Sequence, residues 1–483
     1  MTPTKPRNEE VLIAALLAPD ILDLLESEPS SVAAETEDIH PADLADVAEA
    51  LPRSQIPLFL SVLPADRAAA VLEYFAEELR TELLEAMSPE QAAALVGAMT
   101  PDDRADTLED IDEDHVEDIV DALPAETRRN TQQLLLYPPD SAGGLMTTDV
   151  VSVPEAYTVE EALRRVREIA RSGRREAMNV VYAIDVDGTL KGVMSLRELL
   201  AAPEGARIAD VAWPEVRKVA VTADREEVAR LISEYDLIAI PVVDEKNRVL
   251  GVATVDDVID VIQEEQTEDV QKLGGMEAFD EPYMQTSIAG MLKKRAGWLA
   301  ILLVGEMFTA TAIGYFEDAI ARATVLAMFI PLIISAGGNS GSQGTSLVIR
   351  ALALREVTLR DWWRVAIREL PTGLALGAIL GVIGFVRIEF WQWMSTRAVH
   401  AGPVPLGYDY GVYHVSIAAA VGLSVAGVVL FGALVGSMLP FLLRRLGFDP
   451  ASASAPFVAT LVDVTGVVIY FSFALLLLSG KLL

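Results

Sequence analysis

The segment PFVATLVDVTGVVIYF, residues 456–471, decides how the rest of the chain is interpreted. It belongs to an apolar run from Pro456 to Gly480, which is long enough for one membrane crossing of about 20 residues. Asp463 is the one ionisable residue in that run. A carboxylate at membrane depth costs roughly 2.5–3.5 kcal/mol on insertion scales, so it faces a bundle interior or a water-filled path. Asp463 is therefore either functional or a hydrogen-bonding group between helices.

Four more apolar segments precede this run, and together they predict five membrane crossings. They lie at about 296–316, 323–349, 370–390 and 412–443. Lys and Arg outside the segments cluster at 293–295, 350–368 and 444–445, and five crossings place all three clusters on one side. The positive-inside rule then predicts an inner or plasma membrane protein with a cytoplasmic N-terminal part and an external C-terminus.

The acidic excess lies entirely ahead of the apolar segments. Residues 1–280 contain 24 Lys and Arg against 60 Asp and Glu, whereas residues 281–483 contain 14 against 11. A surface this acidic excludes nucleic acid as a partner and attracts cations. The chain has no cysteine, which excludes disulfides and thiolate metal sites.

The first 130 residues favour short amphipathic helices that begin at regularly placed prolines. An apolar residue followed by proline, or by Ser or Thr and proline, recurs at Leu51, Leu63, Met87, Met99 and Leu123, alternately 12 and 24 residues apart. Proline is tolerated at the first turn of a helix because its missing N–H is not needed there. The period favours an α-solenoid of helix pairs, with an irregular helical bundle as the alternative.

A second repeat occupies residues 140–264. The stretch AIDVDGTLKGVMSLREL, 183–199, aligns without gaps on VVDEKNRVLGVATVDDV, 242–258, at an offset of 59 residues. Each copy predicts two strands and a helix, with another helix before it. This pattern, with MTTDVVSV (146–153) as an entry strand, resembles a tandem pair of CBS domains. That resemblance implies an ATP site at Thr254 and Asp257; the alternative is a helix cap with its first-turn acid.

Three motifs carry a wider resemblance. GGNSGSQ (337–343), LVIRALALREVTLRDW (347–362) and PFVATLVDVTG (456–466) are similar to the hallmark segments of MgtE-type magnesium channels. The order of parts is also similar and covers nearly the whole chain. The resemblance predicts a multidomain fold: an all-α superhelical N-domain (10–135), an α/β tandem CBS pair (136–264), a connecting plug helix (265–295) and an all-α transmembrane domain of five helices (296–483).

The resemblance implies a homodimer in the lipid bilayer with an ion path on its two-fold axis. Asp463 and the Ala459 carbonyl would contact the ion in that path. Magnesium gives up bound water reluctantly, so paired carboxylates accepting hydrogen bonds from its hydration shell are a suitable site. Further pore-lining or structural polar positions would be Asn339, Gln343, Thr465 and Gly466.

The family also implies a cytoplasmic Mg²⁺ sensor that holds the pore closed. The matching acidic positions lie in the N-domain, the CBS pair and the plug helix. They are Asp102, Asp106, Asp224, Glu226, Asp236, Asp257, Asp260, Glu268 and Asp269. A solvated acidic surface is the alternative for any single one of them.

Glu306 stands in the middle of the first apolar segment, where relatives would have a small residue. It predicts either a hydrogen bond to a neighbouring helix or an extra cation or proton contact near the pore. The sequence as a whole predicts a Mg²⁺-selective channel for magnesium uptake, not an enzyme. The alternatives are a broader Co²⁺, Mn²⁺ or Ca²⁺ channel, and a CBS sensor tethered to the membrane.

Overall fold

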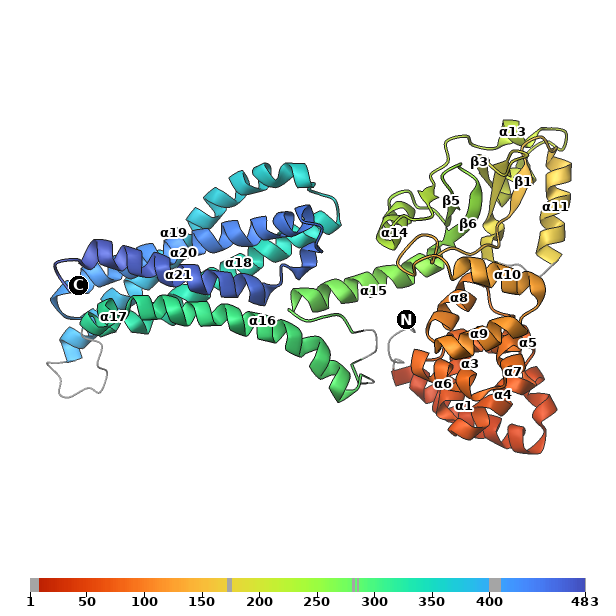
Figure 1. The fold of residues 1–483 in the computed structure, drawn as a ribbon, viewed down its shortest axis with the longest axis horizontal. Coiled ribbons are helices and arrows are strands. Elements are labelled where there is room, and N and C mark those ends of the chain that lie inside the picture. Colours follow the sequence, from red (N-terminus) through yellow and green to blue (C-terminus); the bar gives the residue numbers. More distant parts are fainter. Residues whose placement is uncertain (1–7, 172–175, 280–282, 285, 399–409, 483) are drawn as a thin grey trace. The chain divides into compact units, whose positions relative to one another are not determined.

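The structure is a computed structural model that describes residues 8–171, 176–279, 283–284, 286–398 and 410–482. The chain divides into two compact units, residues 1–265 and 266–483. The first contains the N-terminal helices and the 59-residue repeat, and the second contains the apolar helices (Figure 1).

The N-terminal region consists of short helices around one apolar core in which Phe59 and Phe75 are fully buried. The α-helices are α1 (Asn8–Ser27), α2 (Val32–Glu35), α3 (Pro41–Ala50), α4 (Ile56–Val62), α5 (Ala65–Glu73), α6 (Glu77–Ala86), α7 (Pro89–Val96), α8 (Pro101–Glu109), α9 (Glu113–Ala122) and α10 (Ala125–Leu134). The pairs α1 with α3, α3 with α5, α5 with α7 and α7 with α9 pack on one another. This succession, in which each helix meets the next but one, is the solenoid arrangement and not an irregular bundle.

The prolines predicted to start helices do so. Pro89 and Pro101 occupy the first position of α7 and α8, while Pro64 and Pro124 are the caps of α5 and α10. Pro52 caps a short 3₁₀ turn that leads into α4. A proline at these places fixes φ without removing a needed hydrogen bond.

The repeat gives two three-stranded sheets of identical topology (Figure 1). In the first, β1 (Ser152–Pro154) is parallel to β2 (Val180–Ile184), which is antiparallel to β3 (Leu190–Ser195). The second repeats this with β4 (Val219–Ala220), β5 (Ala239–Val243) and β6 (Val249–Thr254). The helices are α11 (Val159–Arg171), α12 (Leu196–Ala201), α13 (Ile208–Val211), α14 (Arg225–Glu234) and α15 (Val255–Leu273). The entry strand is shorter than expected: Val151 accepts a hydrogen bond from the Tyr182 N–H just before β1, and further back Thr147 forms only an isolated bridge to Val252.

The connecting helix α15 ends at Leu273, immediately before Gly274 and Gly275. Gly275, just past its end, has φ +76°, a left-handed conformation that favours glycine. Ser287 is the N-cap of the next helix, α16 (Ile288–Tyr315). Its hydroxyl accepts a hydrogen bond from the Gly290 N–H. The sequence placed this restart at Glu281, a residue that lies outside the described ranges.

Within the described residues, five helical segments are long and apolar enough to cross a membrane, as predicted. They contain α16, α18 (Ile330–Ala353), α19 (Trp362–Ala398), α20 (His414–Arg445) and α21 (Ala455–Leu478), with the short α17 (Glu317–Arg322) after α16. Helices α16 and α19 are longer than their apolar runs because they continue into polar flanks, as α16 does through Lys293–Arg295.

Glycines of the GGNSGSQ motif bring α18 against α20 and α21. A Cβ at Gly341 would lie 2.7 Å from Val458 Cγ1 on α21 and 3.1 Å from the Gly432 carbonyl oxygen on α20. Ser340 and Thr345 of α18 donate hydrogen bonds to the Val429 and Gly436 carbonyls of α20, at 3.3 and 2.8 Å. Small residues and hydroxyls are the usual means of close helix packing in membranes. The motif is thus a continuous helix, and its glycines serve packing.

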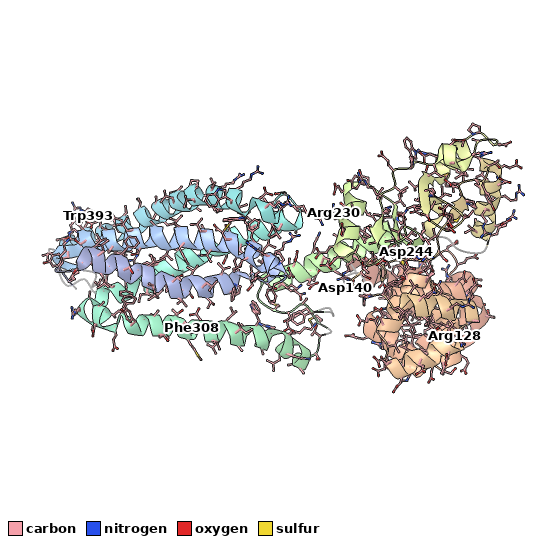
Figure 2. The ribbon with its side chains drawn as sticks, turned by 45° about the horizontal axis from the view of Figure 1, so that its top comes forward. Arg128, Asp140, Arg230, Asp244, Phe308 and Trp393 are labelled. Atoms are coloured by element: carbon pink, nitrogen blue, oxygen red, sulfur yellow. The ribbon has the colours of Figure 1, made fainter. Side chains whose placement is uncertain are left out.

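Helices α16 and α21 run parallel at a nearly constant sequence offset. Trp298 Nε1 donates to Ser454 Oγ at 3.2 Å, and further along the rings of Phe316 and Phe471 stack with centroids 4.8 Å apart. Between these contacts a Cβ at Gly305 would meet Thr460 Cγ2 at 2.5 Å. The opposite face of α16 exposes apolar side chains such as Phe308, labelled in Figure 2. The offset stays between 155 and 156 residues, so equal depths on the two helices can be read from the sequence.

Candidate functional site: an acidic cluster and a membrane carboxylate

Carboxylates from three helices of the first unit gather around Asp102. Asp102 and Asp103 lie in the first turn of α8, Glu73 is the last residue of α5, and Asp257 lies in the first turn of α15. Asp102 is only 5% exposed, and its Oδ1 has no hydrogen-bond partner among the described residues. An unpaired oxygen of a buried carboxylate is costly unless a cation or water satisfies it. This arrangement is typical of a cation site.

Burial and mutual repulsion raise the pKa values of Glu73, Asp102 and Asp257. Burial is the main cause for Asp257, whose pKa is about 8, with the Asp102 charge adding to it. Burial, then Asp103 and Asp102, raises the pKa of Glu73 to about 8. The pKa of Asp102 is about 7, because burial and Asp103 outweigh hydrogen bonds from Thr100 and Thr147. Carboxylates in this state favour a bound cation over remaining charged and alone.

The nearby guanidinium groups are engaged elsewhere. Arg80 forms an ion pair with Asp110, with Nη2 2.5 Å from Oδ2. Arg104 donates to the carbonyl oxygens of Val96 and Met99 at 3.0 and 2.8 Å. Both lie close enough to influence cluster members electrostatically, but their hydrogen bonds go to other groups. The excess negative charge of the cluster is therefore left for a mobile cation.

The structure brings together some of the predicted sensor residues and separates others. Asp106 and Asp260 lie at the solvent-exposed edge of the cluster, one turn beyond Asp102 and Asp257. Asp224 instead caps α14, accepting a hydrogen bond from the Glu226 N–H at 2.8 Å. Asp224, Glu226 and Asp236 are exposed, and none of them is among the main causes of the raised pKa values of Glu73, Asp102 and Asp257. Their proposed ligand role gains no support from this geometry.

Sequence reasoning missed Glu73. The residue stands at the end of an ordinary amphipathic helix, and no local pattern distinguishes it from the many other acids of the N-domain. Only the packing of α5 against its neighbours shows that its carboxyl joins Asp102 and Asp103. Only knowledge of which helices of the solenoid pack side by side would have identified Glu73 as a member of the cluster.

Glu268 and Asp269 of α15 belong to the second unit. Glu268 forms an ion pair with Lys272, whose Nζ also lies 2.6 Å from Asp449 Oδ2. Asp449 caps the 3₁₀ turn that leads into α21, accepting from the Ala451 N–H. The C-terminal end of α15 is thereby tied to the beginning of the helix that carries Asp463.

The Thr254 and Asp257 pair has the local geometry of a helix cap. The Thr254 hydroxyl donates to Asp257 Oδ2 at 2.5 Å. In the first repeat Ser195 and Glu198 form a complete capping box, with each side chain bonded to the other residue's backbone N–H. The capping alternative is thus complete at Ser195, whereas at Thr254 the hydrogen bond joins the two side chains, and Asp257 is also a member of the acidic cluster.

Asp463 lies on α21, half-buried, with its carboxyl within hydrogen-bonding reach of Glu306 on α16. Ala459, one turn earlier on α21, faces α18: a Cβ atom added at Gly338 would lie 3.5 Å from the Ala459 Cβ. Gly466 packs against Val428 and Ile334, and the Thr465 hydroxyl donates to the Leu461 carbonyl at 2.7 Å. In this motif, Ala459 and Gly466 therefore contribute to helix packing, and the Thr465 hydroxyl forms a hydrogen bond within its own helix.

Asn339 and Gln343 line a different space. With Ser335, Leu376, Leu380 and Val429 among the lining residues, they border a cavity of about 640 Å³ between α18, α19 and α20. Ala459, Asp463 and Thr465 do not line this cavity. Asn339 and Gln343 form one polar stripe on α18, and Asp463 with Glu306 forms a separate polar level between α16 and α21.

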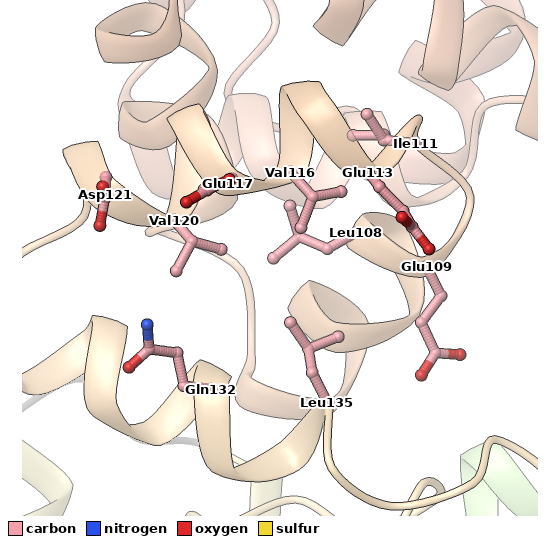
Figure 3. A pocket seen from close by; sticks show the side chains of 10 residues that line it. All are labelled: Leu108, Glu109, Ile111, Glu113, Val116, Glu117, Val120, Asp121, Gln132 and Leu135. Carbon is pink, nitrogen blue, oxygen red and sulfur yellow. The ribbon is translucent and has the colours of Figure 1, made fainter.

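A hollow of about 490 Å³ between α8, α9 and α10 is distinct from the acidic cluster (Figure 3). Its floor is apolar, formed by residues such as Leu108, Val120 and Leu135, and Glu113, Glu117 and Asp121 stand along α9 at its rim. None of the predicted sensor residues lines it. Its carboxylates are exposed, so they lack the burial that distinguishes Asp102.

Comparison with protein families assigns a class to this combination of parts. Residues 330–473 match the family described as divalent cation transporter. Residues 39–140 match the MgtE intracellular N domain, and residues 142–205 and 208–264 match the CBS domain. The protein is therefore a membrane transporter of divalent cations with a CBS pair, and not an enzyme.

Relatives that align over nearly the whole chain identify the family. The magnesium transporter MgtE of Thermus thermophilus is 42% identical over 92% of this chain and 94% of its own length. That of Bacillus subtilis is 31% identical over 91% of this chain and 92% of its own. The chain belongs to the MgtE family of magnesium transporters. A solved cytosolic domain of the Mg²⁺ channel MgtE in complex with ATP is 37% identical, covering 51% of this chain and all of that one, at a TM-score of 0.48.

The raised pKa values predict a stability that depends on pH and on divalent cations. A carboxyl whose pKa is higher folded than unfolded stabilises the fold below its ordinary pKa, and loses this as pH rises through the folded value. In chelator, raising the pH from 6 to 9 should thus destabilise the first unit by about 1–3 kcal/mol, and Mg²⁺ should suppress the loss. Protease susceptibility of the full-length protein during heating measures this.

Asp257→Asn should make the pH dependence shallower, because it removes one of the raised groups. Asp118→Asn is the matched control, since Asp118 is an exposed acid of α9. A pH profile of Asp257→Asn identical to that of wild type would contradict the assignment.

Proposed function

We propose that the protein is a Mg²⁺-selective channel for magnesium uptake, closed by cytoplasmic Mg²⁺ bound at the acidic cluster. The observation that carries the gating proposal is the buried Asp102 carboxyl with an unpartnered Oδ1, surrounded by Glu73, Asp103 and Asp257. Membership of a magnesium transporter family supports the choice of ion.

The sensor would work by joining elements that repel one another when no cation is present. Glu73 and Asp102 belong to the N-terminal helices, whereas Asp257 begins α15. A bound Mg²⁺ would neutralise these carboxylates and hold the N-domain on the second repeat. Glu268 and Asp269, further along α15, remain proposed ligands of the closed state. Loss of Mg²⁺ would restore the repulsion and release α15, which is tied to Asp449 by Lys272.

In the membrane, the proposed path follows the two-fold axis of a homodimer. The Asp463 carboxylates of the two copies would face one hydrated Mg²⁺, with the Ala459 carbonyls accepting further hydrogen bonds from its water. With the N-terminal domains in the cytoplasm and the C-terminus outside, a potential of 100 mV contributes about 2.3 kcal/mol per charge, or roughly twice that for a divalent ion. Uptake would need no other energy source.

Flux into liposomes tests the transport proposal. Wild type should admit Mg²⁺ into vesicles, and Asp463→Ala should reduce the initial rate by about two orders of magnitude, because the charge facing the ion is lost. A fluorescent Mg²⁺ indicator inside the vesicles measures both. Co²⁺, Mn²⁺ and Ca²⁺ in place of Mg²⁺ distinguish a broader divalent channel. Absence of divalent flux in wild type would leave the membrane-tethered CBS sensor as the better function.

Patch recording with Mg²⁺ on the cytoplasmic face tests the gate. Wild-type open probability should fall as Mg²⁺ rises, and Asp102→Asn with Asp257→Asn should increase the half-closing concentration by about tenfold or more, because two ligand charges are lost. Asp118→Asn should leave it unchanged. Wild-type activity that is independent of cytoplasmic Mg²⁺ would refute gating without affecting the transport proposal.

A secondary proposal is ATP at the second repeat, with Thr254 and Asp257 contacting the ribose. The support is their spacing, and the cap hydrogen bond between them must open for nucleotide to enter. Equilibrium dialysis of the full-length protein with labelled ATP should show binding that Thr254→Ala weakens about tenfold. Ser195→Ala, which breaks the matching cap of the first repeat, is the control. Equal binding by wild type and Thr254→Ala would exclude this site.

A further inference from the structure

Glu306 lies at the membrane depth of Asp463. The parallel contacts of α16 and α21 keep an offset of 155–156 residues from Trp298 to Phe316, and position 306 therefore corresponds to residues 461–462, immediately before Asp463. The two carboxyl groups come within hydrogen-bonding reach of each other. The two acids that the sequence singled out separately thus form one polar level.

Local packing fixes the position of Glu306. Gly305, which precedes it, is the point where α16 approaches Thr460 most closely, because any larger residue would meet Thr460 Cγ2. The Thr460 hydroxyl donates to the Pro456 carbonyl at 3.1 Å and is satisfied within its own helix. Glu306 therefore faces the Asp463 level with its backbone held close to α21.

A second polar group near Glu306 lacks a partner. Thr309 follows Glu306 by three residues, which places both on the same face of α16. Thr309 is 8% exposed, and its hydroxyl oxygen has no hydrogen-bond partner among the described residues. A buried hydroxyl without a partner indicates that a water molecule or a hydrated ion completes its hydrogen bonding. This observation is independent of the two acids.

We propose that Glu306 is a specificity-determining residue of the transport path, which positions the Asp463 carboxyl and adds a second negative charge at the same depth. The proposal rests on the proposed conducting role of Asp463. In the proposed homodimer, Glu306 of each copy would add to the two Asp463 carboxylates, so up to four carboxyl groups would surround one ion. This density of negative charge favours a divalent cation, whose bound water can donate to the carboxylates and to the Thr309 hydroxyl. A monovalent cation compensates less of this charge in a poorly solvated place, which is unfavourable.

The test compares Mg²⁺ and Na⁺ flux in liposomes for the full-length protein with no cytoplasmic Mg²⁺. Glu306→Gln keeps the size and hydrogen-bonding reach of the side chain but removes its charge. The ratio of Mg²⁺ to Na⁺ flux should fall by about tenfold or more. Glu306→Asp, which keeps the charge, should retain the ratio within about threefold. Glu317→Gln removes an exposed acid beyond the end of α16 and should behave as wild type.

The outcomes separate this inference from the function on which it rests. Wild type without Mg²⁺ flux, or Asp463→Ala with full flux, refutes the proposed conducting role itself. Wild-type flux that requires Asp463 but a flux ratio unchanged in Glu306→Gln overturns the role of Glu306 alone. An equal loss of the ratio in Glu306→Asp overturns the charge argument. If Glu306→Gln and Glu306→Ala both fail to give monodisperse protein while Glu306→Asp succeeds, Glu306 is structural and the inference is wrong.

Discussion

The membrane unit depends on the close approach of α18 to α20 and α21. In hydrocarbon no hydrophobic force pulls helices together, so association relies on small residues and on hydrogen bonds between helices. Gly341 meets Gly432 and Val458, while Ser340 and Thr345 donate to carbonyl groups of α20. This contact fixes the face of α21 that packs inward, and thereby the direction in which Asp463 is presented. The glycines and hydroxyls of the GGNSGSQ motif thus form a packing surface of the bundle.

The first unit follows a different physical rule. Apart from its apolar cores, it contains one group of carboxyl groups whose burial disfavours their charged forms. The pKa values of Glu73 and Asp257 near 8 and of Asp102 near 7 express that conflict. A solvated acidic surface would not produce it, because exposed acids such as those at the rim of the α9 hollow are screened by water. A bound cation would relieve this conflict, which is why the proposed sensor is based on this cluster and not on the general acidity of the chain.

The structure also revises the sequence-based view of individual residues. Asn339 and Gln343 line a cavity with α19, and Asp224 caps a helix. In contrast, Asp102 and Asp257 come together across more than 150 residues of chain. The domain boundaries, the dimer and the membrane orientation remain predictions. Family membership, the helical N-domain, the repeat and the five apolar helices are confirmed.

The sequence by itself determined the elements, because helix starts, apolar run lengths and the 59-residue repeat are local patterns. Pro89 and Pro101 begin helices, and Gly275 ends one, for reasons contained in a few neighbouring residues. Only the tertiary structure decided which acids meet. Glu73 joins the cluster through the packing of α5, and Glu306 reaches the level of Asp463 because α16 and α21 are parallel with a fixed offset. Contacts between distant segments depend on helix packing, and no local pattern in the sequence specifies them.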